Sequence, residues 1–77
     1  MPLTAYFDRD EQILVRYTTY QHGAKIGDVY VKEFGNDPSA IEDALDHASS
    51  METTHFTAGL NLTETERQAV VDRSPSN

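Results

Sequence analysis

The pattern of apolar and polar positions changes its period near residue 35. Before that point apolar and polar residues alternate with the two-residue period of β-strands. In the best-defined strand this alternation places Ile13, Val15 and Tyr17 on one face. Gly27 indicates a bulge in the third strand, because Ile26 and Val29 cannot share a face in regular pleating. The alternation predicts three strands, over residues 3–7, 12–20 and 25–34.

After residue 35 the spacing becomes helical. A helix is predicted over residues 38–51, with Asp37 as its N-cap and Pro38 at its first position. Thr63 and Glu66 have the spacing of a capping box and predict a second helix that ends at Arg73. Between the helices, residues 53–58 are polar and β-branched around Phe56, which predicts a short strand at the sheet edge.

This order of elements predicts an α+β fold: a small antiparallel sheet of three to four strands with two helices packed on one face. We expect a single domain over residues 1–73 and a flexible tail over 74–77. The sheet face opposite the helices should expose a set of polar and aromatic side chains. These are Tyr6, Arg16, Tyr20 and Lys32.

Charge is the most unusual property of the chain, whose formal net charge is −7. Eight acidic residues lie between Glu33 and Glu66, and that segment contains no Lys or Arg. Direct binding to nucleic acid or to an anionic membrane would need basic clusters, which the sequence lacks. Two interpretations of the acidic segment remain, a solvated surface and a contact for a partner with a basic surface.

Catalytic and metal-binding patterns are missing from the sequence. Cys is absent, and the three His residues do not have metal-ligand spacing. No nucleophile lies near a base in a recognisable motif, and no glycine-rich loop could hold a phosphate. The sequence therefore predicts no enzyme, no cofactor and no metal. Without a secretory signal or an apolar run long enough to cross a membrane, we expect a cytoplasmic protein in its host cell.

The N-terminal hairpin carries two tyrosines and a glycine-containing turn, namely Tyr6, Tyr20, Gly23, Lys25 and Ile26. With these five residues it resembles the start of a family of small phage anti-CRISPR proteins that block the type I-F surveillance complex. The resemblance covers about the first third of the chain. In that family the aromatic residues matching Tyr6 and Tyr20 contact the partner, together with a Glu at the position of Val31. Here Glu33 lies two residues further on, outside the matched position. The resemblance implies a compact α+β domain that prevents target DNA from entering the complex.

The first hypothesis is an inhibitor that binds a basic nucleic-acid-binding surface by presenting carboxylates in place of phosphates. Tyr6 and Tyr20 would be its anchors, and the steering charges would be Glu33, Glu42, Asp43 and Asp46. The alternative is an acidic structural or regulatory module of a phage or plasmid that acts by protein–protein interaction, with halophilic adaptation explaining the charge. We expect a monomer or weak dimer without direct contact to nucleic acid or membrane.

Overall fold

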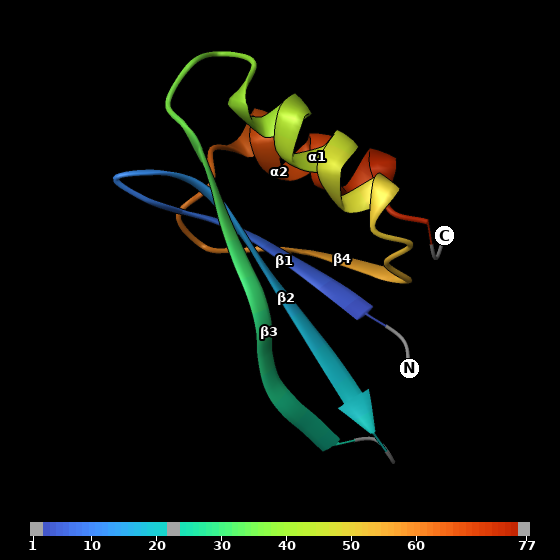
Figure 1. Ribbon diagram of the computed structural model, residues 1–77. Coiled ribbons are helices and arrows are strands. Elements are labelled where there is room, and N and C mark those ends of the chain that lie inside the picture. Colours follow the sequence, from blue (N-terminus) through green and yellow to red (C-terminus); the bar gives the residue numbers. More distant parts are fainter. Residues whose placement is uncertain (1–2, 22–23, 76–77) are drawn as a thin grey trace.

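The computed structural model describes the backbone of residues 3–21 and 24–75 and the side chains of residues 3–19 and 30–75. All the predicted elements are present, which confirms the α+β fold (Figure 1). In chain order they are β1 (Leu3–Asp10), β2 (Gln12–Gln21), β3 (Ala24–Gly35), α1 (Ala40–Ser50), β4 (His55–Ala58) and α2 (Glu64–Arg73).

The four strands form one sheet in the order β3-β2-β1-β4. The pairs β1–β2 and β2–β3 are antiparallel, whereas β4 pairs with β1 in parallel. The expectation of a wholly antiparallel sheet was therefore wrong for β4. The reason is the connection: α1 carries the chain across the sheet, and a strand that follows such a crossover returns in the direction of the strand before it. β4 lies at the sheet edge, as predicted.

The first turn is tighter than the sequence suggested. The first predicted strand ends at residue 7, but residues 8–10 continue β1 and pair with residues 12–14 of β2. Only Glu11 lies between the strands, and its φ of 67° is in the left-handed region. Charged side chains do not end the ladder here because backbone groups, not side chains, make its hydrogen bonds.

The pairing of β2 with β3 is irregular around Gly27. Tyr17 is opposite Tyr30 and Thr18 is opposite Asp28, so the register passes over Val29. A second shift passes over Ile26, and Gly27 itself pairs with Thr19. The bulge predicted near Gly27 is thus present as two irregularities, one on each side of it. The predicted turn at 21–24 includes residues 22–23, which lie outside the described part of the chain.

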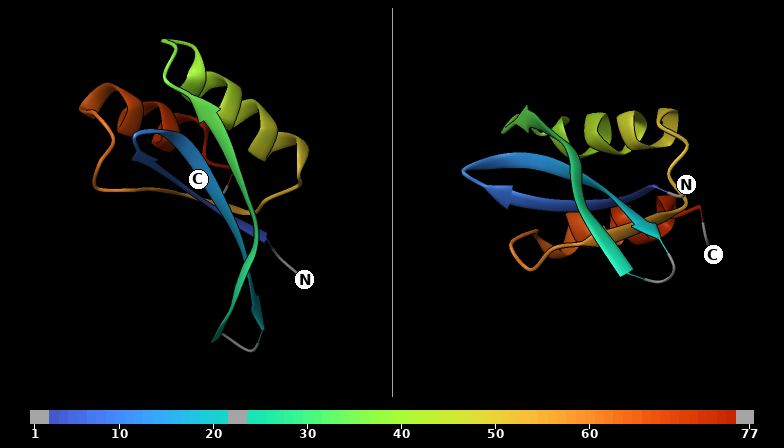
Figure 2. Two further views of the ribbon diagram at one scale, coloured as in Figure 1. Left: turned by 60° about the vertical axis from the view of Figure 1, so that its left-hand side comes forward. Right: turned by 60° about the horizontal axis from the view of Figure 1, so that its bottom comes forward.

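Both helices lie on the same side of the sheet, where the hydrophobic core is formed (Figures 1 and 2). The predicted inner face of β2 is confirmed, because Ile13, Val15 and Tyr17 are each at most 1% exposed. α1 packs mainly on β2 and β3, and α2 packs beside β4. The helices contribute apolar side chains at helical spacing, namely Ile41, Ala44, Leu45, Ala48 and Val70.

The two helix starts differ in how well the sequence located them. α2 has the predicted capping box, in which Thr63 and Glu66 each accept a hydrogen bond from the other's backbone N–H. α1 begins two residues later than predicted, with Ser39 as N-cap. The carbonyl of Asp37 accepts a hydrogen bond from the Ala40 N–H, so Asp37 belongs to the preceding turn. A turn and a helix start favour the same residue types, which explains the error.

Gly59 joins β4 to the loop before α2 at a point of close contact with β1. Its N–H donates to the Phe7 carbonyl at 2.6 Å, and a Cβ placed on Gly59 would lie 2.5 Å from Cγ of Asp8. The Asp8 carboxylate in turn accepts a hydrogen bond from the backbone N–H of Asn61 at 3.2 Å. Only a residue without a side chain fits this junction.

We therefore expect Gly59→Ala to lower the free energy of unfolding by about 1–3 kcal/mol, because Asp8 must move and release the Asn61 N–H. Urea denaturation of the two proteins measures the difference. Thr57→Ala, at an exposed position of the same strand, is the control and should change stability by less than about 0.5 kcal/mol. Equal stability of Gly59→Ala and the parent protein would contradict the close contact.

Candidate interaction site

The residues that were predicted from the sequence to form an interaction site do not lie on one surface of the molecule. Tyr6 is half-buried opposite Arg16, on the sheet face that points away from the helices. Glu33 is exposed on the same face, opposite Leu14. The three other proposed charges lie on the helical side of the molecule, on α1, and are Glu42, Asp43 and Asp46. The side chain of Tyr20 lies outside the described residues.

Lys32 was also placed on the wrong face. It pairs with Val15, an inner residue of β2, so its side chain leaves the sheet on the helical side. Its Nζ atom lies 5.5 Å from the centre of the Phe34 ring, in a cation–π arrangement. The bulge at Val29 interrupts the alternation of β3 before Lys32. The sheet face of Lys32 therefore cannot be found by counting residues along the sequence.

Arginines from outside the acidic segment neutralise several of its carboxylates. At the end of α2, Arg73 donates to Glu42 at 3.1 Å and to Asp46 at 2.8 Å. Arg9 of β1 pairs with Glu66 at 2.5 Å. The acids are uncompensated in sequence but partly compensated in space, because the fold brings distant basic residues to them. Among the described residues, Asp43 is exposed and forms no ion pair.

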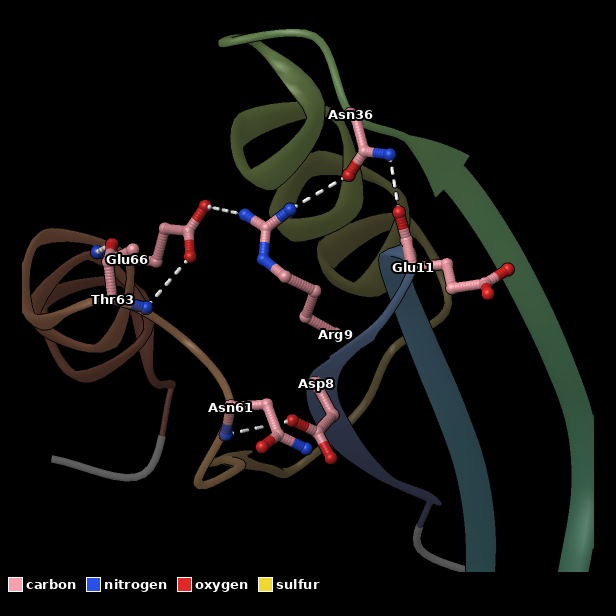
Figure 3. Close-up of polar contacts among 7 residues, drawn as sticks. All are labelled: Asp8, Arg9, Glu11, Asn36, Asn61, Thr63 and Glu66. Atoms are coloured by element: carbon pink, nitrogen blue, oxygen red, sulfur yellow. Dashed lines mark hydrogen bonds and ion pairs between the residues drawn. The ribbon is translucent and has the colours of Figure 1, made fainter.

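The Arg9–Glu66 pair belongs to a polar network that connects three loops with α2 (Figure 3). Arg9 also donates to the side-chain oxygen of Asn36 at 2.8 Å, and Asn36 donates to the carbonyl of Glu11. Glu66 uses its second carboxylate oxygen to accept from the Thr63 N–H at 2.9 Å. The two charged side chains that make these bonds, Arg9 and Glu66, are already satisfied within the chain. Its arrangement therefore fits a structural role, which is to fix the start of α2 against the end of β1.

His47 contacts aromatic rings that the sequence did not connect with it. Its Nδ1 atom is 2.6 Å from the hydroxyl of Tyr17, and its ring centre is 5.6 Å from those of Tyr17 and Phe34. Tyr30 stacks on Tyr17 at 5.9 Å between ring centres and lies 6.3 Å from His47. We call these four residues, Tyr17, Tyr30, Phe34 and His47, the His47 cluster.

The sequence predicts solvent-exposed histidines, but His47 is half-buried between α1 and the sheet. His55 is exposed on β4, at the opposite edge of the sheet from β3. Only the periodicity of α1 could have pointed to His47, because it follows the buried Ala44 by three residues. The contacts with Tyr17, Tyr30 and Phe34 join residues far apart in the chain and leave no local signal.

Burial, and next the neighbouring Tyr30, raise the pKa of Tyr17 to about 12. Its ring is completely buried, and its hydroxyl is satisfied by His47. Ionising this phenol would place a negative charge in the core, where it is poorly solvated. At neutral pH Tyr17 is therefore a neutral hydrogen-bonding group that holds His47 in position.

A shallow, open hollow follows one side of α2 and is lined by Glu64, Thr65, Gln68, Ala69 and Asp72. Among the described residues, no three His, Asp or Glu side chains gather closely enough to hold a metal ion. None of the helices in residues 3–21 and 24–75 is long and apolar enough to cross a membrane.

Comparison with known proteins gave no match: no family model, no curated protein and no solved structure is significantly similar to this chain. Its function has to be argued from its own residues.

The capping box and the Arg9 contact together make Glu66 important for α2. We expect Glu66→Ala to lower the free energy of unfolding by about 1–2 kcal/mol, because it removes one cap interaction and a partly buried ion pair. Glu64→Ala, in the same helical turn but exposed, should cost only a few tenths. Chemical denaturation of both variants checks this, and equal losses would show that the network of Figure 3 does not stabilise the fold.

The raised pKa of Tyr17 makes stability depend on pH in the alkaline range. The folded-state pKa of about 12 exceeds the unfolded value of 10.0. The contribution of neutral Tyr17 to the free energy of unfolding is therefore complete below pH 10 and is lost as pH rises to 12. Each pKa unit corresponds to about 1.4 kcal/mol. We expect the stability difference between parent and Tyr17→Phe to shrink over this range in denaturation experiments. A difference that is constant from pH 9 to pH 12 would contradict it.

Proposed function

We propose that this chain is a small inhibitor that presents the acidic surface of α1 to a basic, nucleic-acid-binding surface of a partner complex. The observation that carries the proposal is the exposure of Glu42, Asp43 and Asp46 along one helix. The partner class suggested by the N-terminal hairpin is a CRISPR surveillance complex of type I-F. The protein would act there by occupying the groove that target DNA must enter.

The charge balance around α1 supports this choice of surface. Three carboxylates lie within two turns of the helix, and Arg73 compensates only part of them. The side chains of Glu42 and Asp46 remain 58% and 70% exposed in spite of their contacts with Arg73. Glu64 and Asp72 extend the negative charge along the outer side of α2. Carboxylates in such an arrangement attract cationic grooves and raise association rates.

The proposal changes the role of the sheet face. Tyr6 and Glu33 lie on the side of the sheet away from α1, so one partner surface cannot contact them and the acids of α1 in the same flat interface. We therefore assign the steering charges to α1 and leave Tyr6 out of this contact. Tyr6 packs across from Arg16, an ordinary cross-strand arrangement.

The alternative of a self-associating module would need an edge strand that can pair with a second copy. β3 is the longer of the two sheet edges, but its register is interrupted by irregularities. It also carries Lys32 and Glu33 next to each other, and bulges and charges on an edge oppose pairing with another strand. These features favour a monomer, and so a contact with a different protein.

The test measures binding of labelled target DNA to purified type I-F surveillance complex in the presence of this protein. We expect the protein to prevent DNA binding, and the inhibition to weaken as salt rises. Asp43→Asn should slow association by about two- to five-fold at low salt. Glu33→Gln removes one charge from the opposite face and is the matched control, for which no change is expected.

A third variant makes the surface of α1 more negative instead of less negative. Arg73→Gln leaves Glu42 and Asp46 uncompensated, so it should speed association while the exposed ion pairs cost at most about 1 kcal/mol of stability. DNA binding that is indifferent to the protein would refute inhibition of this complex. Equal effects of Asp43→Asn and Glu33→Gln would refute α1 as the contact surface.

A further inference from the structure

The His47 cluster is a preformed group of rings that the acidic surface of α1 does not explain. Tyr17 is fully buried and forms its base, with its hydroxyl fixed by His47. Tyr30 stacks on it with an angle of 19° between the ring planes. One face of Tyr30 is therefore held by the core, while the residue as a whole is still 44% exposed. Large aromatic rings that are fixed from beneath and open above are common anchors of protein interfaces.

One helical turn before His47, α1 carries an exposed carboxylate. Asp43 precedes His47 by four residues, and residues at this spacing are neighbours on the surface of a helix. Asp43 is exposed, whereas Glu42 and Asp46 are held by Arg73. The exposed Tyr30 and the exposed Asp43 thus belong to two elements that contact each other, β3 and α1.

We propose that the His47 cluster and Asp43 bind an arginine side chain of the basic partner, with the guanidinium stacked on Tyr30 and paired with Asp43. Arginine fits better than lysine because its planar group stacks on rings and donates two parallel hydrogen bonds to a carboxylate. The chain itself shows that this region tolerates a cation, since Lys32 lies over the Phe34 ring at 5.5 Å. This inference rests on the proposed function and specifies its anchor.

The probe is a short oligo-arginine peptide, compared with an oligo-lysine peptide of the same length and charge. Binding is followed by NMR titration of the intact protein, which reports on the rings of Tyr30 and His47 separately. We expect the arginine peptide to bind about two- to five-fold more tightly, the range of an exposed cation–π contact. The Tyr30 and His47 ring signals should shift with arginine and much less with lysine.

Three variants separate the contacts. Tyr30→Leu should abolish the preference for the arginine peptide, although both peptides should still bind through their charge. Tyr30→Phe should keep this preference because the aromatic ring remains. Asp43→Asn should weaken the arginine peptide more than Glu33→Gln does. The folded spectrum of each variant in the absence of peptide shows that the domain is intact, so a loss of preference in Tyr30→Leu cannot come from unfolding.

The outcomes distinguish this inference from the proposed function. Equal binding of the two peptides to the parent protein, with shifts confined to α1, would overturn the arginine site and leave the acidic surface in place. Retention of the arginine preference in Tyr30→Leu would overturn it as well. Loss of the preference in Tyr30→Leu but not in Tyr30→Phe supports it, whether or not the surveillance complex is the partner in the inhibition assay.

Discussion

The hydrogen bond between Tyr17 and His47 is the constraint on which the relation of sheet and helix depends. Tyr17 lies on β2, in the middle of the sheet, and its ring is completely covered. A hydroxyl buried there needs a hydrogen-bond partner. Without one, the hydroxyl would lose its hydrogen bonds to water on folding and the fold would be less stable. His47 is the partner, and because it belongs to α1 the bond fixes which side of the helix faces the strands. The buried positions of α1 and the exposure of its acids both follow from that orientation.

A chain of 77 residues without cysteine needs other links between its parts. Arg9 supplies one of them, since its guanidinium joins β1 to the loop after β3 and to the first turn of α2 (Figure 3). Arg73 supplies a second at the far end of α2, where it contacts α1. Two of the few basic residues are therefore used to join helices to the rest of the fold. Their ion pairs with Glu66, Glu42 and Asp46 make the acidic segment less negative in space than its sequence suggests.

The sequence was most informative where the signal is local. The capping box of Thr63 and Glu66 and the alternation of Ile13, Val15 and Tyr17 depend on residues a few positions apart, and the structure confirms both. The direction of β4, the position of Lys32 and the surroundings of His47 depend on contacts between distant residues or on a bulge, and the sequence prediction missed all three. Of the proposed site, exposure of the α1 acids was predictable from helical spacing. Their separation from Tyr6 was not, because it follows from which sheet face the helices cover.

The parallel pairing of β4 with β1 has a consequence for how the chain reaches its native state. The hairpins β1–β2 and β2–β3 join neighbours in sequence, so they can form early and at small entropic cost. β4 can reach its place beside β1 only after α1 has crossed the sheet. During synthesis the edge of β1 therefore stays unpaired until residues 55–58 have left the ribosome. A nascent chain stalled before His55 would expose that edge. An unpaired strand edge of this kind favours aggregation with other chains.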